Sequence, residues 1–277
     1  MIEGTRLLER ISRKPRTLPE EALVDGFAEG KISVIMPAYN EAGCIGASVS
    51  DMKKQFETAY QDIEIIVVDD GSLDGTGKVA RNLSGERVKV VGYDRNQGKG
   101  YALKEGFLHA RGEITFLVDS DSEIHAKDLR AYVQALDGAD IVIGSKRHPS
   151  SSVRTPPIRR FLSLGYNILE RLLTGVRASD TQAGFKAARS TVLYRVLPLL
   201  SVKRYAFDAE FLAVASLLNL RIRELPVEIE LTATFSARQV FRMLIDLLGI
   251  CYRLRISRWY QRNMRILEES YQPIIRW

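Results

Sequence analysis

Short apolar runs rich in β-branched residues alternate with helical stretches through the first half of this 277-residue chain. We expect strands over 32–36, 63–68, 88–91, 114–118 and 141–143, and helices over about 42–58, 74–84, 98–111 and 126–137. This alternation is typical of βαβ units and predicts an α/β fold whose sheet is mostly parallel and flanked by helices. In such sheets, ligands bind outside the carboxyl ends of the strands. The candidate functional residues are therefore those that directly follow the strands.

Acidic residues follow three of the five predicted strands. Asp69 and Asp70 come after the second strand, Asp94 after the third, and Asp119 and Asp121 after the fourth. Carboxylates that converge at one edge repel each other unless a cation joins them, and Mg²⁺ or Mn²⁺ takes one or two carboxylates together with substrate phosphates. Asp119 and Asp121 lie on the same side of an extended segment, which favours a metal site. A single aspartate after a strand is also typical of a turn or a helix cap, so that alternative stays open for the others.

The positive charge of the chain is concentrated near its C-terminal end. The formal net charge is +6, and residues 238–277 hold eight arginines against three carboxylates. No apolar stretch approaches the roughly 20 residues of a membrane-spanning helix, and the first residues lack the apolar core of a signal peptide. Cys44 and Cys251 form no metal-type or disulfide-framework pattern, so a reducing, cytosolic setting is the default. We therefore expect a cytoplasmic protein whose basic end faces an anionic partner.

Residues 238–267 combine seven arginines with apolar side chains at helical spacing. The apolar positions are Val240, Phe241, Leu244, Leu247, Leu248, Cys251 and Leu254. Trp259 and Tyr260 follow, and both side-chain types favour the bilayer interface. One interpretation is an amphipathic segment that lies on the cytoplasmic face of an anionic membrane. The alternative is a helix packed on the core with a solvated basic face. We accordingly divide the chain into an N-terminal extension over 1–30, a main domain over 31–237 and a basic amphipathic segment over 238–277.

The second half of the chain offers candidates for a phosphate site. A long Ser/Pro-rich loop follows Lys146 and Arg147 and leads to Arg159, which fits either a mobile lid or a solvated surface loop. A short glycine-containing segment adds Asp180, Gln182 and Lys186. The next apolar helix begins with Asp208 and Glu210, where the helix dipole favours carboxylates whether or not they have a function.

Four motifs in the first half resemble those of the inverting glycosyltransferases of family 2, which have the GT-A fold. They are Pro-Ala-Tyr-Asn-Glu at 37–41, Val-Val-Asp-Asp-Gly-Ser-x-Asp-Gly-Thr at 67–76, Asn-Gln-Gly-Lys-Gly at 96–100 and Asp-x-Asp at 119–121. Three later motifs resemble the polyprenyl-phosphate glycosyltransferases within that family, and above all their dolichyl-phosphate β-glucosyltransferase branch. They are Gly-Ser-Lys-Arg-His at 144–148, Asp-Thr-Gln-Ala-Gly-Phe-Lys at 180–186 and Ala-Phe-Asp-Ala-Glu at 206–210. The resemblance covers residues from about 32 to 245.

The resemblance implies a role for each matching residue in the catalytic domain. Binding of the donor nucleotide sugar is implied for Pro37, Tyr39, Glu41, Asp69, Lys99 and Asp119. Metal binding is implied for Asp119, Asp121 and Glu123, where Glu123 replaces the glutamine that the family often has. Binding of the acceptor and its phosphate is implied for Lys146, Arg159, Ser163, Gln182, Lys186 and, displaced by one residue from the family pattern, Arg238. The implied catalytic residues are Asp119, Asp121 and Asp180, of which Asp180 would orient the acceptor or the sugar.

The resemblance also implies a reaction. An oxygen of a polyprenyl (dolichyl) phosphate attacks the anomeric carbon of the nucleotide sugar with inversion. The phosphate monoester is mostly anionic at neutral pH, so it needs positioning and charge shielding more than a general base. Mg²⁺ or Mn²⁺ stabilises the leaving nucleoside diphosphate. We expect glucose from UDP-glucose as the sugar, with mannose from GDP-mannose or N-acetylglucosamine as alternatives.

Two other classes of function compete with an enzyme. A non-catalytic protein that binds a sugar nucleotide or an anionic lipid is disfavoured because Asp119 and Asp121 are both present. A nucleic-acid binder is suggested by the arginine-rich end alone, and no aromatic-interleaved basic strand or zinc-type spacing supports it. We therefore expect no nucleic-acid partner, and we leave self-association open.

Overall fold

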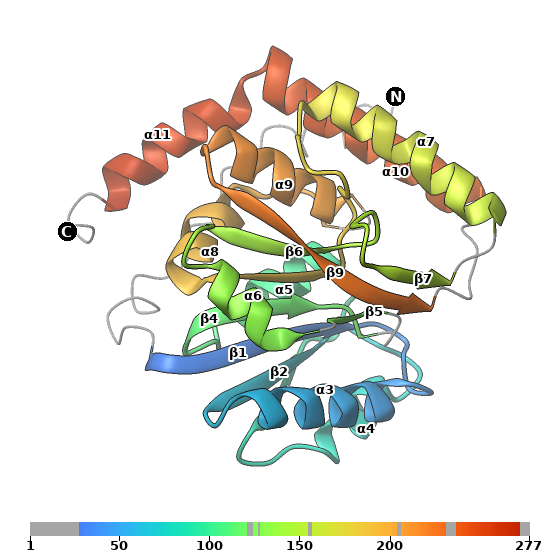
Figure 1. Ribbon diagram of the computed structural model, residues 1–277, viewed down its shortest axis with the longest axis vertical. Coiled ribbons are helices and arrows are strands. Elements are labelled where there is room, and N and C mark those ends of the chain that lie inside the picture. The colour runs from blue at the N-terminus through green and yellow to red at the C-terminus, as the bar shows by residue number, and fades with distance from the viewer. Residues whose placement is uncertain are drawn as a thin grey trace.

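The computed structural model describes residues 28–120, 124–126, 128–154, 157–203, 206–230 and 237–271. Its strands are β1 Ala28–Ala38, β2 Ile63–Asp69, β3 Val88–Gly92, β4 Gly112–Val118, β5 Ile124–Ala126, β6 Ile141–Ser145, β7 Ser152–Arg154, β8 Phe185–Arg189 and β9 Ile222–Glu230. Its helices are α3 Ile45–Ala59, α4 Thr76–Arg81, α5 Lys99–Phe107, α6 Leu129–Ala135, α7 Pro157–Thr174, α8 Ser190–Val196, α9 Phe207–Leu217, α10 Ala237–Cys251 and α11 Trp259–Tyr271, with a 3-10 turn η1 Leu197–Leu199 and a π-helical turn η2 Tyr252–Ile256. The strands form a sheet in the order β3-β2-β1-β4-β8-β6-β9-β5, and β7 pairs with β9 (Figure 1).

The first half of the sheet is the parallel arrangement that the sequence predicts. β1 pairs in parallel with both β2 and β4, and β2 pairs in parallel with β3. Alternate residues of β1 enter two separate cores: Val34 and Met36 pack in the cluster that contains Phe56 of α3, and Ile35 packs in the cluster that contains Leu103 of α5. Because both faces of these strands are covered, the strands read as continuous apolar runs. β1 begins at Ala28, inside the extension predicted for 1–30, and the rest of that extension lies outside the described residues.

The second half of the sheet is mixed. β8 lies between β4 and β6 and is antiparallel to both, whereas β6 and β9 are parallel. The sequence does not predict β8, because Phe185–Arg189 is a five-residue strand within a segment that contains glycine and alanine. Its position follows from tertiary pairing on both edges, which local sequence does not reveal. Since β8 is antiparallel to both neighbours, the carboxyl ends of β4 and β6 lie at the same edge.

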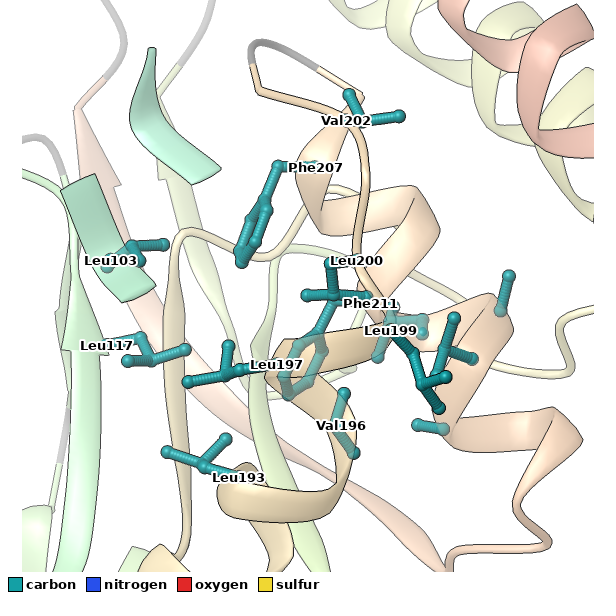
Figure 2. Close-up of a cluster of buried hydrophobic side chains, with 14 of the residues drawn as sticks. Leu103, Leu117, Leu193, Val196, Leu197, Leu199, Leu200, Val202, Phe207 and Phe211 are labelled. Atoms are coloured by element: carbon teal, nitrogen blue, oxygen red, sulfur yellow. The ribbon is translucent and has the colours of Figure 1, made fainter. Parts of the chain in front are cut away.

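A buried hydrophobic cluster fixes α9 against the sheet. Phe207 and Phe211 of α9 share this cluster with Leu117 of β4, Leu193 of α8 and Leu197 of η1 (Figure 2). Nine of the eleven residues of α9 are buried, so this helix is apolar around most of its circumference. Each large side chain buried in this way contributes about 1.5–3 kcal/mol to folding. The start of α9, with its two carboxylates, is therefore held rigidly beside the sheet.

The C-terminal helices are partly integrated into this core. Met243, Leu247 and Ile250 of α10 are buried, and α10 lies beside α7 along one side of the molecule (Figure 1). Trp259 and Tyr260 are 8% and 0% exposed, so the expectation that they lie at a bilayer interface is wrong. None of the described helices combines the length and the apolar character needed to cross a bilayer.

Candidate active site

The residues that follow four strands share one rim of the sheet. β1, β2 and β4 are parallel neighbours, and the antiparallel β8 gives β6 the same direction as β4. The rim therefore holds Tyr39 after β1, Asp70 after β2, Asp119 after β4 and Lys146 after β6. This is the convergence of polar side chains that the strand pattern predicts.

The loops after β1 and β2 are joined by hydrogen bonds. The Asn40 amide donates to Ser72 Oγ at 3.0 Å, and the Glu41 amide donates to Thr76 Oγ1 at 2.8 Å. Asn40 adopts a φ of 56°, a left-handed conformation that asparagine tolerates better than most residues. Two of the family-like motifs, at 37–41 and 67–76, thus form a single surface patch.

The residues predicted to hold the donor nucleotide lie on this patch. Pro37 is the penultimate residue of β1, and Tyr39 is 42% exposed. Asp69 Oδ1 accepts the Ser72 amide at 3.0 Å, so its orientation is fixed. A Cβ atom at Gly77 would clash with Asp69 Oδ2, so a larger residue there would force this carboxylate to move. The structure brings these residues together, and their contact with a nucleotide stays a prediction.

Asp70 is a structural anchor. It is 2% exposed, and its carboxylate accepts hydrogen bonds from Tyr93 Oη at 2.7 Å, Asn96 Nδ2 at 3.0 Å, the Gln97 amide at 2.7 Å and the Gly98 amide at 2.8 Å. Burial and the bond to Asp70 raise the pKa of Tyr93 above its ordinary value, so the phenol stays protonated and donates. These four bonds fix the Asn-Gln-Gly-Lys-Gly loop and place Lys99 at the start of α5.

Lys99 belongs to a chain of alternating charges that begins at Asp119 on the rim. Its Nζ lies 2.7 Å from Asp119 Oδ1 and 2.9 Å from Asp208 Oδ2. Asp208 also accepts a bond from Lys186 Nζ, and Lys186 is 1% exposed. Two ammonium groups and two carboxylates thus compensate each other, with Lys186 and Asp208 buried and with Lys99 and Asp119 about a quarter exposed.

The pKa values in this chain follow from burial and from the partners. Burial opposes the charge on Lys99, but Asp119 and Asp208 outweigh it and raise the pKa of Lys99. Burial lowers the pKa of Lys186, and Asp208 offsets only part of this effect. Burial raises the pKa of Asp208, but Lys186 and Lys99 outweigh it and bring that pKa to about 2. Asp208 is therefore ionised at neutral pH and holds both lysines in place.

A second polar cluster surrounds Asp180, which is 1% exposed. Asp180 Oδ2 accepts the Lys146 amide at 2.9 Å, and Asp180 Oδ1 accepts the Gln182 amide at 3.1 Å. The ammonium group of Lys146 donates to the Gln182 carbonyl at 3.1 Å. The predicted catalytic residue Asp180 is thus brought together with Lys146 and Gln182, two predicted acceptor-site residues, whereas Lys186 lies in the other chain of charges.

Glu170 on α7 is a buried carboxylate that the sequence does not single out. It is 0% exposed and accepts bonds from the Thr181 hydroxyl and, at 3.0 Å, from Gln182 Nε2. Burial is the main cause that raises the pKa of Glu170 to about 7. The available signal is its helical spacing from Asn167 and Thr174, which places three polar residues on the inward side of an otherwise amphipathic helix.

Glu210 also has a structural role. Its carboxylate accepts bonds from the Ser201 amide at 2.9 Å, the Val202 amide at 2.7 Å and the Tyr260 hydroxyl, and it lies 3.4 Å from Arg253 Nη2. Arg253 is buried, unlike the solvated arginine that the sequence suggests. This cluster joins α9 to the C-terminal helices.

Some of the predicted site residues lie outside the part of the chain, or the side chains, that the structure describes. Asp121 and Glu123 lie outside the described residues, and the side chains of Arg159 and Arg238 are not described. Ser163 lies in α7, where its carbonyl accepts a bond from Arg147 Nη2 at 3.2 Å. Within the described ranges, no group of three or more His, Cys, Asp or Glu side chains is arranged to hold a metal ion. The metal assignment therefore depends on Asp119 and on two residues beyond those ranges.

Comparison with known proteins identifies similar chains. The family described as "Glycosyl transferase family 2" matches residues 33–197. A dolichyl-phosphate beta-glucosyltransferase of Dictyostelium discoideum is 30% identical over 251 residues, which cover 82% of this chain and 76% of that protein. The human protein of the same name is 30% identical over 256 residues, which cover 85% of this chain and 79% of that protein.

Solved structures share the fold at lower identity. Glucosyl-3-phosphoglycerate synthase from Mycobacterium tuberculosis, in complex with Mn²⁺ and UDP-glucose, has a TM-score of 0.53 and 20% identity, covering 83% of this chain and 82% of that one. A mannosyltransferase from Pyrobaculum calidifontis, in complex with GDP-mannose and Mn²⁺, has a TM-score of 0.54 and 19% identity, covering 100% of this chain and 83% of that one. The α/β architecture expected from the sequence is confirmed.

Proposed function

Because this chain belongs to glycosyl transferase family 2, we propose that it transfers glucose from UDP-glucose to a polyprenyl phosphate such as dolichyl phosphate. The observation that carries this proposal is the match, at 30% identity and over more than four fifths of the chain, to proteins named dolichyl-phosphate beta-glucosyltransferase. Mannose from GDP-mannose and N-acetylglucosamine remain the alternative sugars. The reaction is transfer to a phosphate oxygen with inversion at the anomeric carbon.

The donor site of this proposal is the patch formed by the loops after β1 and β2. Tyr39 and Asp69 bind the base and the ribose, together with Pro37 and Glu41. Lys99 supplies positive charge beside the diphosphate, and Asp208 fixes its ammonium group at 2.9 Å. A charge that is already positioned stabilises the leaving diphosphate without reorganisation, which is the most effective form of electrostatic catalysis.

The proposed cofactor is Mg²⁺ or Mn²⁺, held by Asp119, Asp121 and Glu123. All three side chains offer only carboxylate oxygens, which suit these hard cations. Asp119 Oδ1 lies 2.7 Å from the Lys99 ammonium group, so a metal ion bound through Asp119 would share or displace this contact. When bound, the metal supplies Lewis-acid stabilisation of the diphosphate. The fit of the other two ligands stays part of the proposal.

The acceptor site of the proposal is the Asp180 cluster. The proposed phosphate-binding residues are Lys146, Arg159, Ser163, Gln182 and Arg238, and Lys186 contributes its charge from the neighbouring cluster with Asp208. Asp180 holds the backbone of both Lys146 and Gln182, so it orients this site. The lysine charge shields the acceptor phosphate from the donor diphosphate, two anions that otherwise repel each other. Since the acceptor is a lipid, we place the enzyme at the cytoplasmic face of a membrane.

The test is a transfer assay with purified protein. UDP-glucose, GDP-mannose and UDP-N-acetylglucosamine are each incubated with Mn²⁺ or Mg²⁺ and with dolichyl phosphate, and the products are identified by mass spectrometry. Phosphoglyceric acid, which is bound in solved structures of this fold, serves as a water-soluble acceptor control. The proposal predicts a hexosyl-phosphoryl-dolichol formed from UDP-glucose. Donor binding without any transfer would instead favour the non-catalytic binding protein.

A further inference from the structure

Exposed hydrophobic side chains are concentrated on two neighbouring helices. Among the described residues, eleven large hydrophobic side chains are exposed, and eight of them belong to α7, α10 and η2. We call these eight the outer face: Leu164, Ile168, Leu172, Phe241, Ile245, Leu248, Tyr252 and Ile256. Isolated exposed apolar residues are normal on a protein surface, but a contiguous set marks a surface that binds something.

The helices that carry the outer face lie against each other. Tyr166 Oη donates to the Met243 carbonyl at 3.1 Å, and Arg255 Nη2 donates to the Leu172 carbonyl at 3.1 Å. The pair lies along one side of the molecule, away from α3 and α4 (Figure 1). The part from Phe241 to Ile256 extends for about 22 Å at the helical rise of 1.5 Å per residue.

Each helix has a second side that is turned inward. Met243, Leu247 and Ile250 of α10 are buried, as are Asn167 and other polar residues of α7. The sequence predicts an amphipathic C-terminal segment, but it does not show which residues of the apolar stripe remain exposed. It also does not assign any part of this surface to α7.

The charges around the outer face have one sign. Among the described side chains of α7 and of residues 240–265, every exposed charged side chain is an arginine, and Asp246 is half-buried. The exposed arginines are Arg160, Arg171, Arg242, Arg255, Arg258, Arg262 and Arg265. An apolar face flanked by arginine complements a bilayer surface that presents anionic headgroups above acyl chains. A symmetric dimer through this face would bring the same arginines against themselves, which disfavours a second copy as the occupant.

We propose that the outer face docks on an anionic lipid bilayer, with its eight apolar side chains in the headgroup and acyl boundary. The inward side of α7 contacts the proposed acceptor site: Asn167 Nδ2 donates to Thr181 Oγ1 at 2.9 Å, and Glu170 Oε1 accepts from Gln182 Nε2 at 3.0 Å. One helix therefore contacts the bilayer on one side and the Asp180 cluster on the other. Docking would present the acceptor site to a lipid phosphate, and this role rests on the proposed function. The docking itself does not.

The experiment is flotation of the full chain with vesicles of phosphatidylcholine alone or mixed with phosphatidylglycerol. We expect binding to the anionic vesicles that weakens as salt is added. The triple variant Phe241→Ser, Leu248→Ser, Ile256→Ser should bind these vesicles at least about tenfold more weakly. Each removed apolar side chain lowers the apolar area that is buried in the bilayer. Its control is Leu73→Ser, which removes a side chain that is 87% exposed but lies outside the outer face. Circular dichroism confirms that both variants are folded.

The charge contribution is tested separately. Arg171→Glu with Arg242→Glu should abolish the preference for anionic vesicles, whereas Lys54→Glu on the distant, exposed side of α3 should not. The proposal is overturned if wild-type protein does not float at low salt, or if the triple variant binds as well as Leu73→Ser. It is also overturned if sedimentation shows a wild-type dimer that the triple variant converts to a monomer. Transfer to a short, water-soluble prenyl phosphate without vesicles should survive in the triple variant, so a failure of docking can be told apart from a failure of the proposed activity.

Discussion

The buried carboxylate of Glu170 should make the stability of this protein depend on pH near neutrality. The Glu170 side chain is 0% exposed, and its described partners are a hydroxyl and an amide rather than a cation at bonding distance. Glu170→Gln keeps the size of the side chain and removes the charge. The carbonyl of the introduced glutamine can still accept from Gln182, and its amide group can donate to the Thr181 hydroxyl.

The size and sign of the effect follow from the raised pKa. Burial is the largest cause, and it raises the pKa of Glu170 from 4.5 to about 7. Below pH 4.5 the carboxyl is protonated in both the folded and the unfolded chain, so it carries no penalty. As pH rises from 4.5 to about 7, the unfolded chain ionises while the folded chain keeps its proton, so stability falls over this interval and levels off above it. The gap between the two pKa values corresponds to on the order of 3 kcal/mol in the free energy of unfolding.

The assay is urea unfolding at several pH values from about 5 to about 8, which span the raised pKa. As pH rises across this range, the wild type should lose on the order of 3 kcal/mol in the free energy of unfolding relative to Glu170→Gln. Glu57→Gln on the exposed side of α3 is the control and should keep the pH dependence of the wild type. Parallel curves for Glu170→Gln and the wild type would refute the reasoning, because they would mean that Glu170 is not buried as an isolated carboxylate.

Three further predictions concern the charged clusters. Asp208→Asn should lower the free energy of unfolding by about 3–5 kcal/mol in urea titration, because it removes the anionic partner of the buried Lys186 and one of the two anionic partners of Lys99. Adding Lys186→Met should recover part of that loss. Glu210→Gln should weaken the contact with Arg253 and speed amide hydrogen exchange in α11 more than in β1, whereas equal exchange in both elements would contradict it. Asp119→Asn should reduce turnover about 100-fold while thermal unfolding stays cooperative, and near-wild-type turnover would remove Asp119 from the proposed metal site.

The parallel half of the fold is predictable from sequence because its strands are buried on both faces. Ile32–Met36 and Ile63–Val68 are apolar throughout most of their length, and loops that follow parallel strands necessarily share one edge. β8 is not predictable in this way, because its pairing with β4 and β6 is a tertiary property of a short segment. The same applies to Asp70, whose four partners come from a loop more than 20 residues further along the chain.

Residue types in the sequence indicate where the candidate site lies. They do not show which residues are accessible at the rim and which hold other residues in place. Asp119, Asp180 and Asp208 all lie in motifs that resemble those of the glycosyltransferases. In the structure all three contact lysines or backbone amides, but Asp180 and Asp208 are buried, whereas Asp119 is partly exposed at the rim. Burial is the cause of the difference, and burial depends on helices that are far away in sequence. Tyr260 is a second example, because it is buried and its hydroxyl donates a hydrogen bond to the buried Glu210 carboxylate.

The stereochemistry of the product tests the central proposal most directly. UDP-glucose carries an α-linked sugar, so one direct attack by a phosphate oxygen gives a β-glucosyl phosphate. The measurement is the configuration of the anomeric carbon, by proton NMR, in the product formed from UDP-glucose and a short-chain polyprenyl phosphate in the presence of Mn²⁺. The proposal predicts a single β-linked glucosyl-phosphoryl-polyprenol. An α-linked product would contradict inversion, and free glucose as the sole product would contradict transfer to phosphate.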